Sequence, residues 1–190
     1  MAKTIAMDDR SGVQLTPMGA TTAALFRIGM GLLYLWAFVT AAFGVGYQNA
    51  DPPGSATNYG WHFTYDSSMG WITSGFKHSP TAGFVSILHG PLAFIPQKLP
   101  TGVDDFFWVF AIAGLGFALT LGILMRIAGW GGFALNILLW FCLFPPDNNP
   151  ILDGEHMAFA FGILLLMFVH AGNWWGFGRP WSRHTPAWLN

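Results

Sequence analysis

The sequence predicts an all-α integral membrane protein, a four-transmembrane-helix bundle with a long outer loop. The chain of 190 residues is 53% hydrophobic and only 9% charged, whereas a soluble domain carries about 25% charged residues. Four stretches carry no charged side chain, namely residues 28–50, 106–125, 127–146 and 157–178. Each is long enough for a membrane-spanning helix, which needs roughly 20 mostly apolar residues to cross about 30 Å of hydrocarbon.

The first transmembrane span is expected at about residues 21–44. The polar segment 1–20 precedes it and is expected to be a cytoplasmic arm. The apolar run starts late and is longer than the 7–15 residues of a signal-peptide core, so we interpret it as a retained span. A long outer loop, residues 45–104, follows it and is rich in glycine, proline, serine and aromatic residues.

Three further spans complete the predicted membrane domain, which covers residues 21–174. They are expected at about residues 105–125, 127–144 and 153–173. Arg126 marks a tight turn between the second and third spans, and the Pro145-Pro146 pair ends the third. Residues 175–190 form an aromatic and basic tail that we place in the cytoplasm.

A weaker apolar run lies inside the outer loop at residues 84–95, where His89, Gly90 and Pro91 interrupt it. The run is too short and broken for a comfortable span, so we interpret it as a re-entrant or interfacial segment. Backbone of that kind is tolerated at membrane depth only against protein or a wet cavity. A fifth span is the alternative, and it would place the two termini on opposite faces.

Positive charge sets the expected orientation in the cell membrane. Four spans place both termini on one side, together with Lys3, Arg10, Arg126, Arg179 and Arg183. The other side holds only two lysines and most of the acidic residues. We therefore expect a multi-pass protein with both termini cytoplasmic and the long loop facing outward.

Composition and motifs exclude several classes of function. A formal net charge of −1 gives no basic footprint for nucleic acid. The single Cys142 rules out an intrachain disulfide and cysteine-ligated iron–sulfur or c-type haem sites. No nucleotide-binding, zinc-protease or serine-hydrolase motif is present. We therefore expect no intrinsic haem, flavin or metal, and any redox role would use diffusible quinone from the membrane.

The candidate catalytic residues are Asp153, Glu155 and His156, at the outer entry of the fourth span. Asp153 and His156 are three positions apart and share a helix face. A carboxylate beside an imidazole can hold its tautomer and support proton exchange with a quinone. Helix capping is the alternative for Asp153 and Glu155, because acidic residues suit a helix N-terminus. Capping does not account for His156.

The candidate substrate-binding residues are Arg27, Lys77, His78 and His89. A charge inside a membrane segment, such as that of Arg27, indicates function by default, although a long arginine near a helix end can also snorkel to the interface. Lys77 and His78 are an adjacent basic pair that could dock an anion, and a solvated loop cation is the alternative.

Several motifs together resemble the DoxX family and its DoxD type, the large subunit of thiosulfate:quinone oxidoreductase. The resemblance covers most of residues 21–181. The matching segments are Arg27 with Gly31, residues 71–76 (WITSGF), 89–94 (HGPLAF), 119–126 (LTLGILMR), the stretch from Asn149-Pro150 to His156, and 171–178 (AGNWWGFG). Trp71 and Asn149, which belong to these motifs, are the candidates for holding the quinone.

The resemblance implies a four-helix membrane protein that oxidises thiosulfate, or a similar small sulfur anion, at the outer face and passes electrons to the quinone pool. It also implies a small partner subunit. The alternative is a non-catalytic structural or assembly subunit of a larger respiratory or redox complex, which the small size and the missing cofactor motif favour. A small-solute carrier is weaker, because the spans show no repeat.

Overall fold

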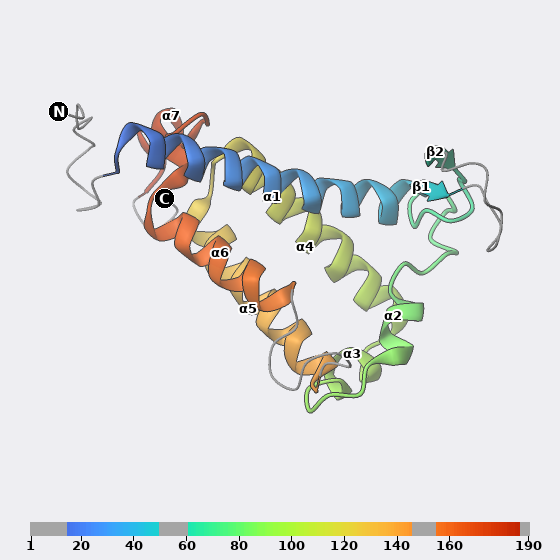
Figure 1. The fold of residues 1–190 in the computed structure, drawn as a ribbon. Helices are drawn as coiled ribbons and strands as arrows, with labels where there is room; N and C mark the ends of the chain where they lie inside the picture. Colours follow the sequence, from blue (N-terminus) through green and yellow to red (C-terminus); the bar gives the residue numbers. More distant parts are fainter. Residues whose placement is uncertain (1–14, 50–60, 146–154, 187–190) are drawn as a thin grey trace.

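The computed structural model describes residues 15–49, 61–145 and 155–186, and it is mostly helical. Its four longest helices are α1 (Pro17–Phe43), α4 (Thr101–Leu121), α5 (Met125–Leu143) and α6 (His156–Phe168). α1 packs along α4, and α5 packs along α6 (Figure 1). The two pairs meet at the end that holds the start of α1 and the short helix α7 (Gly178–Ser182), here called the α7 end. They diverge toward the opposite end, here called the hairpin end.

α1 starts and stops at residues suited to those positions. The Thr16 hydroxyl accepts a hydrogen bond from the Gly19 N–H at 3.1 Å, and Pro17 occupies the first turn, where its missing N–H costs nothing. Gly44 ends the helix with φ 69°, a left-handed conformation that glycine adopts without strain. The helix is therefore four residues longer at its start than the predicted span.

α4 lies four residues earlier in the chain than the predicted second span. It starts directly after Pro100, and Asp104 lies in its first turn, where a carboxylate suits the helix dipole. Gly122, with φ 73°, ends it before Arg126 is reached. α5 then starts after Leu124, so the predicted tight turn is present but lies at residues 122–124.

Three helices, α1, α4 and α5, are long and apolar enough to cross a membrane. Large apolar side chains are exposed along them, including Leu33 at 56%, Phe107 at 64% and Trp130 at 55%. These helices indicate a multi-pass membrane protein. α6 has 13 residues, which extend only about 20 Å at 1.5 Å per residue. The fourth span, expected at residues 153–173, is therefore not established, since Val169 and His170 leave the helix and residues 153 and 154 lie outside the described part.

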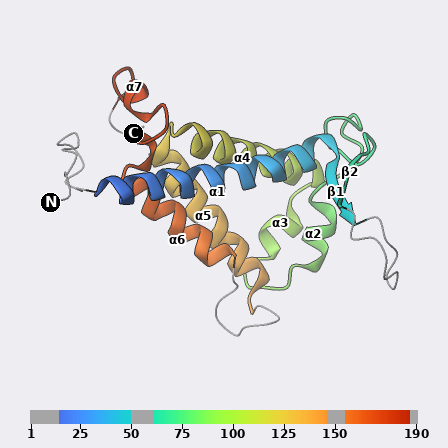
Figure 2. The same cartoon turned by 45° about the horizontal axis from the view of Figure 1, so that its top comes forward.

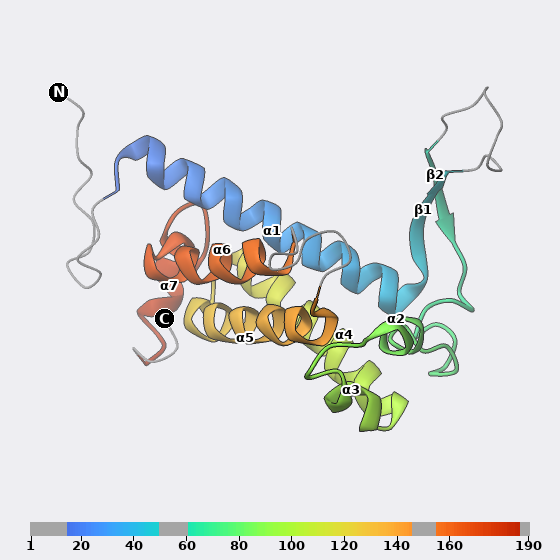
Figure 3. The same ribbon diagram turned by 60° about the horizontal axis from the view of Figure 1, so that its bottom comes forward.

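The segment between α1 and α4 carries its own structure at the hairpin end. Strand β1 (Val45–Asn49) pairs antiparallel with β2 (Trp61–Tyr65) in the register Val45 to Tyr65. This hairpin projects away from the helices, and the short helices α2 (Ala82–Ile87) and α3 (Phe94–Lys98) follow it (Figures 2 and 3). The all-α expectation missed the hairpin because the segment's many turn residues suggested a loop.

The interrupted run at residues 84–95 is divided between α2, α3 and the irregular backbone that joins them. That backbone packs against the end of α5, where the N–H groups of His89 and Gly90 both donate to the Cys142 carbonyl, at 3.3 and 2.8 Å. Leu88 and Ala93 are buried with Cys142. A fifth span here is therefore wrong, because α2 and α3 are separate helices of six and five residues.

Small residues let the paired helices approach closely. Gly31 of α1 faces Thr120 of α4, and a Cβ placed on Gly31 would lie 2.5 Å from the Thr120 backbone nitrogen. Gly116 similarly contacts Leu35, and Gly132 of α5 contacts Ile163 of α6. The main apolar core lies between the pairs and contains Met30, Leu115, Leu119, Met125, Ile163 and Leu166.

We expect Gly31→Ala to destabilise the fold, because its Cβ would push α1 away from α4. The expected loss is about 1–3 kcal/mol of unfolding free energy, as for other overpacked contacts. Gly29→Ala is the matched control, since a Cβ on Gly29 meets nothing within 4 Å. Thermal unfolding in detergent measures both. Equal stability of the two variants would show that the α1–α4 contact is not this close.

Candidate functional site

Arg27 is fully buried in α1 and joins three parts of the chain at the α7 end. Its Nη1 donates to the carbonyl oxygens of Leu119 and Thr120, the latter at 3.0 Å, in the last turn of α4. Its Nη2 donates to the carbonyl oxygens of Trp174 and Trp175, each at 3.1 Å. The guanidinium therefore fixes both the end of α4 and the segment before α7 to α1.

These bonds complete the end of α4. The last four carbonyls of a helix have no partner inside it, and a cation near them is favoured by the helix dipole. The Ala118 carbonyl accepts from the N–H groups of Gly122 and Ile123 at 2.8 and 3.1 Å. The Leu121 carbonyl accepts from the Phe177 N–H at 2.8 Å. Arg27 donates to the Leu119 and Thr120 carbonyls, so all four terminal carbonyls of α4 have donors.

Glycines surround this guanidinium and let the backbone approach it closely. A Cβ on Gly122 would lie 2.8 Å from Nη1 of Arg27, and one on Gly176 would lie 2.9 Å from Nη2. Gly172 and Gly178 lie against the same backbone, and a Cβ on Gly178 would be 2.9 Å from the Gly122 carbonyl oxygen. Backbone from α4 and the tail can thus reach the arginine only because these positions lack side chains.

The burial of Arg27 contradicts one of the two roles expected for this residue. Snorkelling is wrong, because the side chain has no exposed surface. Its four hydrogen bonds all go to protein carbonyls. Anion binding by Arg27 remains a prediction, and it would require these bonds to be given up.

We expect Arg27→Met to destabilise the protein by on the order of 3 kcal/mol or more, because buried carbonyls that lose a donor cost about 1–3 kcal/mol each. The tail beyond Trp174 would also become accessible to protease. Arg126→Met, which removes an exposed arginine from the first turn of α5, is the control. Thermal unfolding and limited proteolysis provide the measurements, and a wild-type digestion pattern in the Arg27 variant would contradict this role.

A second polar group lies between the helix pairs. Asn136 of α5 is 2% exposed, and its Nδ2 donates to the Gly132 carbonyl at 2.7 Å and to the Tyr34 hydroxyl at 2.8 Å. The Gly132 carbonyl can only accept, so the amide nitrogen must face it. The Tyr34 oxygen must then accept from the same nitrogen. Within the described residues, the Tyr34 hydroxyl proton is left with no hydrogen-bond acceptor.

The predicted catalytic His156 lies about one helical turn from Phe159, whose ring packs against Tyr34. The Tyr34 ring is tilted against that of Phe159, with 6.3 Å between centroids. Phe159 is three positions after His156 in α6, so the two side chains share a helix face. Helices α1, α5 and α6 thus bring Tyr34, Asn136 and Phe159 together, and His156 lies about one turn from Phe159 along α6. Sequence reasoning found only His156, because a tyrosine and an asparagine inside spans carry no motif.

The other residues predicted with His156 are placed less fully. Glu155 is exposed, directly precedes α6 and makes no capping hydrogen bond through its side chain. Asp153 and Asn149 lie outside the described residues. Their predicted roles in catalysis and quinone binding therefore stay predictions.

Trp71 lies at the hairpin end, where it connects α1 and α4. It is 8% exposed and packs with Ala42 and Val109. The Trp71 backbone N–H donates to the Ala41 carbonyl at 2.9 Å. The centroid of its ring lies 4.8 Å from the centroid of the Phe76 ring. The structure thus gives Trp71 a packing role, and its predicted contact with a quinone is not tested.

Lys77, His78 and His89 lie at the hairpin end but in different places. Lys77 is exposed, and the His78 N–H donates to Ser74 Oγ at 3.0 Å. Hydrogen bonds from the Ser68 side chain and backbone, and then the charge of His78, hold the pKa of the Asp66 carboxyl below its usual range. His89 lies beside α5, with its ring nitrogens 3.1 and 3.2 Å from the carbonyl oxygens of Ile87 and Pro145.

The four predicted substrate-binding residues are therefore not brought together. Arg27 precedes the end of α1, at Phe43, by 16 residues, which is about 24 Å along the helix. Lys77, His78 and His89 all belong to the segment beyond that end. A small anion could contact the Lys77–His78 pair or His89, but the structure builds no single site from all four.

Asp105 is a buried carboxylate that sequence reasoning treated only as an outer charge. It lies in α4 at 3% exposure. Its Oδ1 accepts from Ser79 Oγ at 2.7 Å, from Thr81 Oγ1 at 2.6 Å and from the Thr81 N–H at 3.3 Å. These bonds anchor the start of α2 to α4. The sequence sign of this contact was the Ser-Pro-Thr stretch at 79–81, which supplies the hydroxyl donors. It lies 24 to 26 residues before Asp105 in the chain, so the sequence does not reveal the contact.

We expect Asp105→Ala to lower stability by on the order of 3 kcal/mol, since three donors, two of them in buried hydrogen bonds, lose their acceptor. Asp105→Asn keeps an amide oxygen in the same place and should be close to wild type. Thermal unfolding compares the two. Equal loss in both variants would instead assign the effect to the negative charge.

Comparisons of the chain with models of protein families, with curated proteins and with solved structures each find no match. The resemblance to DoxX and DoxD proteins therefore remains a prediction from the motifs.

Proposed function

We propose that this chain is a membrane subunit of a quinone-linked oxidoreductase and that quinone docks beside Tyr34. One observation carries the proposal. The Tyr34 hydroxyl is held by Asn136 within apolar helices, and its own proton has no acceptor among the described residues. A quinone headgroup fits such a place, because its carbonyl oxygen accepts a hydrogen bond and its ring packs against an aromatic side chain such as Phe159.

Histidine 156 would serve proton transfer in this scheme. Reduction of a quinone to a quinol takes up two electrons and two protons. His156 lies about one helical turn from Phe159, and histidine is the side chain that most readily exchanges protons near neutral pH. The Tyr34 hydroxyl would orient the quinone oxygen, while His156 would pass protons between this region and the hairpin end.

The electron donor is proposed from the resemblance, as thiosulfate or a similar small sulfur anion. Two thiosulfate anions lose two electrons in joining as tetrathionate, which matches the two electrons a quinone accepts. Lys77 and His78 offer positive charge at the hairpin end for such an anion. A partner subunit, also implied by the resemblance, would complete the electron route between the anion and the quinone.

We place the protein in the cell membrane with four spans, the fourth including α6, and with both termini in the cytoplasm. The charge distribution supports this orientation. Among the described residues, Arg126, Arg179 and Arg183 belong to the α7 end, whereas Asp66, Asp104, Asp105 and Glu155 belong to the hairpin end. Positive charge concentrates on the cytoplasmic side of membrane proteins.

A structural or assembly subunit of a redox complex is the second candidate. The observation that favours it is an aromatic face on the first half of α4, where Phe106, Phe107 and Phe110 are 47, 64 and 59% exposed. The rings of Phe106 and Phe110 lie only 4.4 Å apart. Such a face could contact another apolar subunit as well as lipid.

The catalytic proposal is tested by thiosulfate-dependent reduction of a short-chain quinone in membranes that contain the protein and its native partners. We expect Tyr34→Phe to raise the quinone KM about tenfold, the usual scale for one lost hydrogen bond of about 1.4 kcal/mol. His156→Ala should lower kcat. Tyr65→Phe is the control, because Tyr65 is 61% exposed on the hairpin.

The Asn136→Leu variant distinguishes a packing role of the Tyr34–Asn136 pair from a role in quinone binding. That variant removes the interhelical bond but leaves the Tyr34 hydroxyl, so it should reduce stability more than quinone affinity. Wild-type kinetics in folded Tyr34→Phe and His156→Ala would remove both residues from the reaction. Co-purification of a catalytic partner, with no change in its rate, would then favour the structural subunit.

A further inference from the structure

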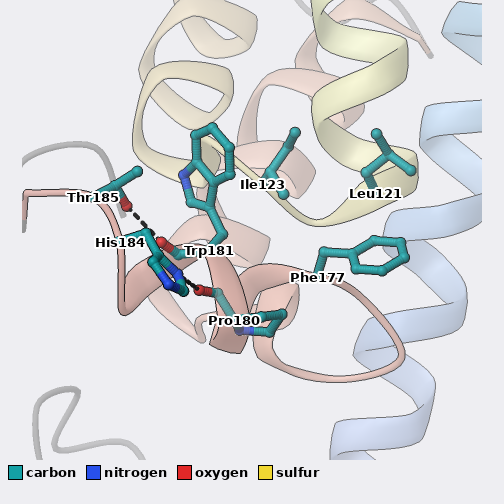
Figure 4. Close-up of a pocket in the computed structure, with 7 residues that line it drawn as sticks. All are labelled: Leu121, Ile123, Phe177, Pro180, Trp181, His184 and Thr185. Carbon is teal, nitrogen blue, oxygen red and sulfur yellow. Dashed lines mark hydrogen bonds between the residues drawn. The ribbon is translucent and has the colours of Figure 1, made fainter.

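A depression at the α7 end lies outside the proposed quinone and anion sites. Its volume is about 480 Å³, within the roughly 300–1,000 Å³ range of small-molecule sites. The residues that line it are Leu121, Ile123, Phe177, Pro180, Trp181, His184 and Thr185. Figure 4 shows the Trp181 indole between Thr185 and Ile123, with Phe177 and Leu121 on the far side. The lining joins the end of α4 to α7 and the residues after it.

The position of this depression favours lipid as its occupant. α4 is long and apolar enough to cross a membrane, and Leu121 is its last residue. The depression therefore lies at the level where the apolar part of α4 ends. A ligand there can place an apolar chain beside Leu121 and Ile123 and a polar group beside α7.

Two arginines next in sequence to lining residues favour an anionic headgroup. Arg179 directly precedes Pro180, and Arg183 directly precedes His184. Both arginines are exposed, and no described carboxylate forms an ion pair with either. The Arg179 guanidinium lies 5.2 Å from the Trp174 ring centroid, which leaves its N–H donors available for a phosphate.

The wall of the depression also contains an unpartnered donor. The Trp181 indole Nε1 is buried and has no hydrogen-bond partner among the described residues. A buried N–H without a partner costs about 1–3 kcal/mol, so an acceptor brought there is favoured. The ester and phosphate oxygens of a phospholipid are acceptors of this kind.

We propose that this depression binds an anionic phospholipid, with an acyl chain against Leu121, Ile123 and Trp181 and the phosphate beside Arg179 and Arg183. This site is independent of the quinone proposal, because Tyr34 and Asn136 lie in the helices α1 and α5 and do not line it. It would be a specific lipid site on the side of the membrane that holds α7.

Native mass spectrometry of the detergent-purified full chain, titrated with phosphatidylglycerol or phosphatidylcholine, tests this. We expect tighter binding of phosphatidylglycerol and a loss of about tenfold or more in its affinity when Arg179→Gln and Arg183→Gln are combined, on the scale expected for two membrane-facing arginines. Lys98→Gln, which removes an exposed cation at the hairpin end, is the control for charge and should bind as wild type.

A second pair of variants tests the depression itself. Ile123→Trp should fill it and weaken phosphatidylglycerol binding with all arginines present. If that variant does not fold, His184→Trp fills it from the exposed tail. Equal affinity for the two lipids, or wild-type binding in the folded filled variant, would overturn the proposal. So would competition by glycerol phosphate without acyl chains, because that would assign binding to the phosphate alone.

Discussion

The buried guanidinium of Arg27 is the contact on which the α7 end depends. A membrane offers no water to a helix end that lies at its depth, so orphan carbonyls must find donors in the protein. Arg27 supplies donors to two of the four carbonyls that end α4 and to two more before α7. This one side chain fixes the end of α4 and the start of the tail to α1, and Gly122 and Gly176 leave room for its guanidinium.

At the hairpin end, mostly backbone N–H groups donate to the carbonyls that end α1 and α5. The last carbonyls of α1 accept from the N–H groups of Trp71 and Ile72 at 2.9 Å and from the Thr73 hydroxyl at 3.4 Å. The end of α5 accepts from Gly90. The segment between α1 and α4 therefore donates capping hydrogen bonds to the ends of α1 and α5. Asp105 fixes it from the other side by binding Ser79 and Thr81.

Sequence alone predicted the apolar helices well, because lipid leaves a strong compositional signal. The positions of α1, α4 and α5 follow from the charge-free stretches, with errors of a few residues. The hairpin was missed because its strands have only five residues each and lie in a segment whose many turn residues suggested a loop. The fourth span was placed from apolar content, which continues past the residue where α6 ends, so composition could not reveal the left-handed His170 that breaks the helix.

Site residues were harder to predict than helices, since their roles depend on contacts between distant segments. Arg27 was singled out as a charge inside a span, but its partners lie 92 to 148 positions away and are carbonyls, which no motif encodes. The Tyr34–Asn136 bond joins residues 102 positions apart. His156 was found from its neighbours in the chain, and the fold places Phe159, about one turn further along α6, against Tyr34.

Arg27 and the Tyr34–Asn136 pair differ in what they leave available to a ligand. Both terminal nitrogens of Arg27 are used on carbonyls, so an anion could recruit them only by releasing the end of α4. Tyr34 is different, because its oxygen accepts the bond that joins α1 to α5 while its proton remains free to be donated. A ligand at Tyr34 therefore adds a hydrogen bond without breaking the one that joins the helix pairs. This difference is why we propose Tyr34 as the quinone contact and describe Arg27 as the residue that joins α1 to the end of α4 and to the tail.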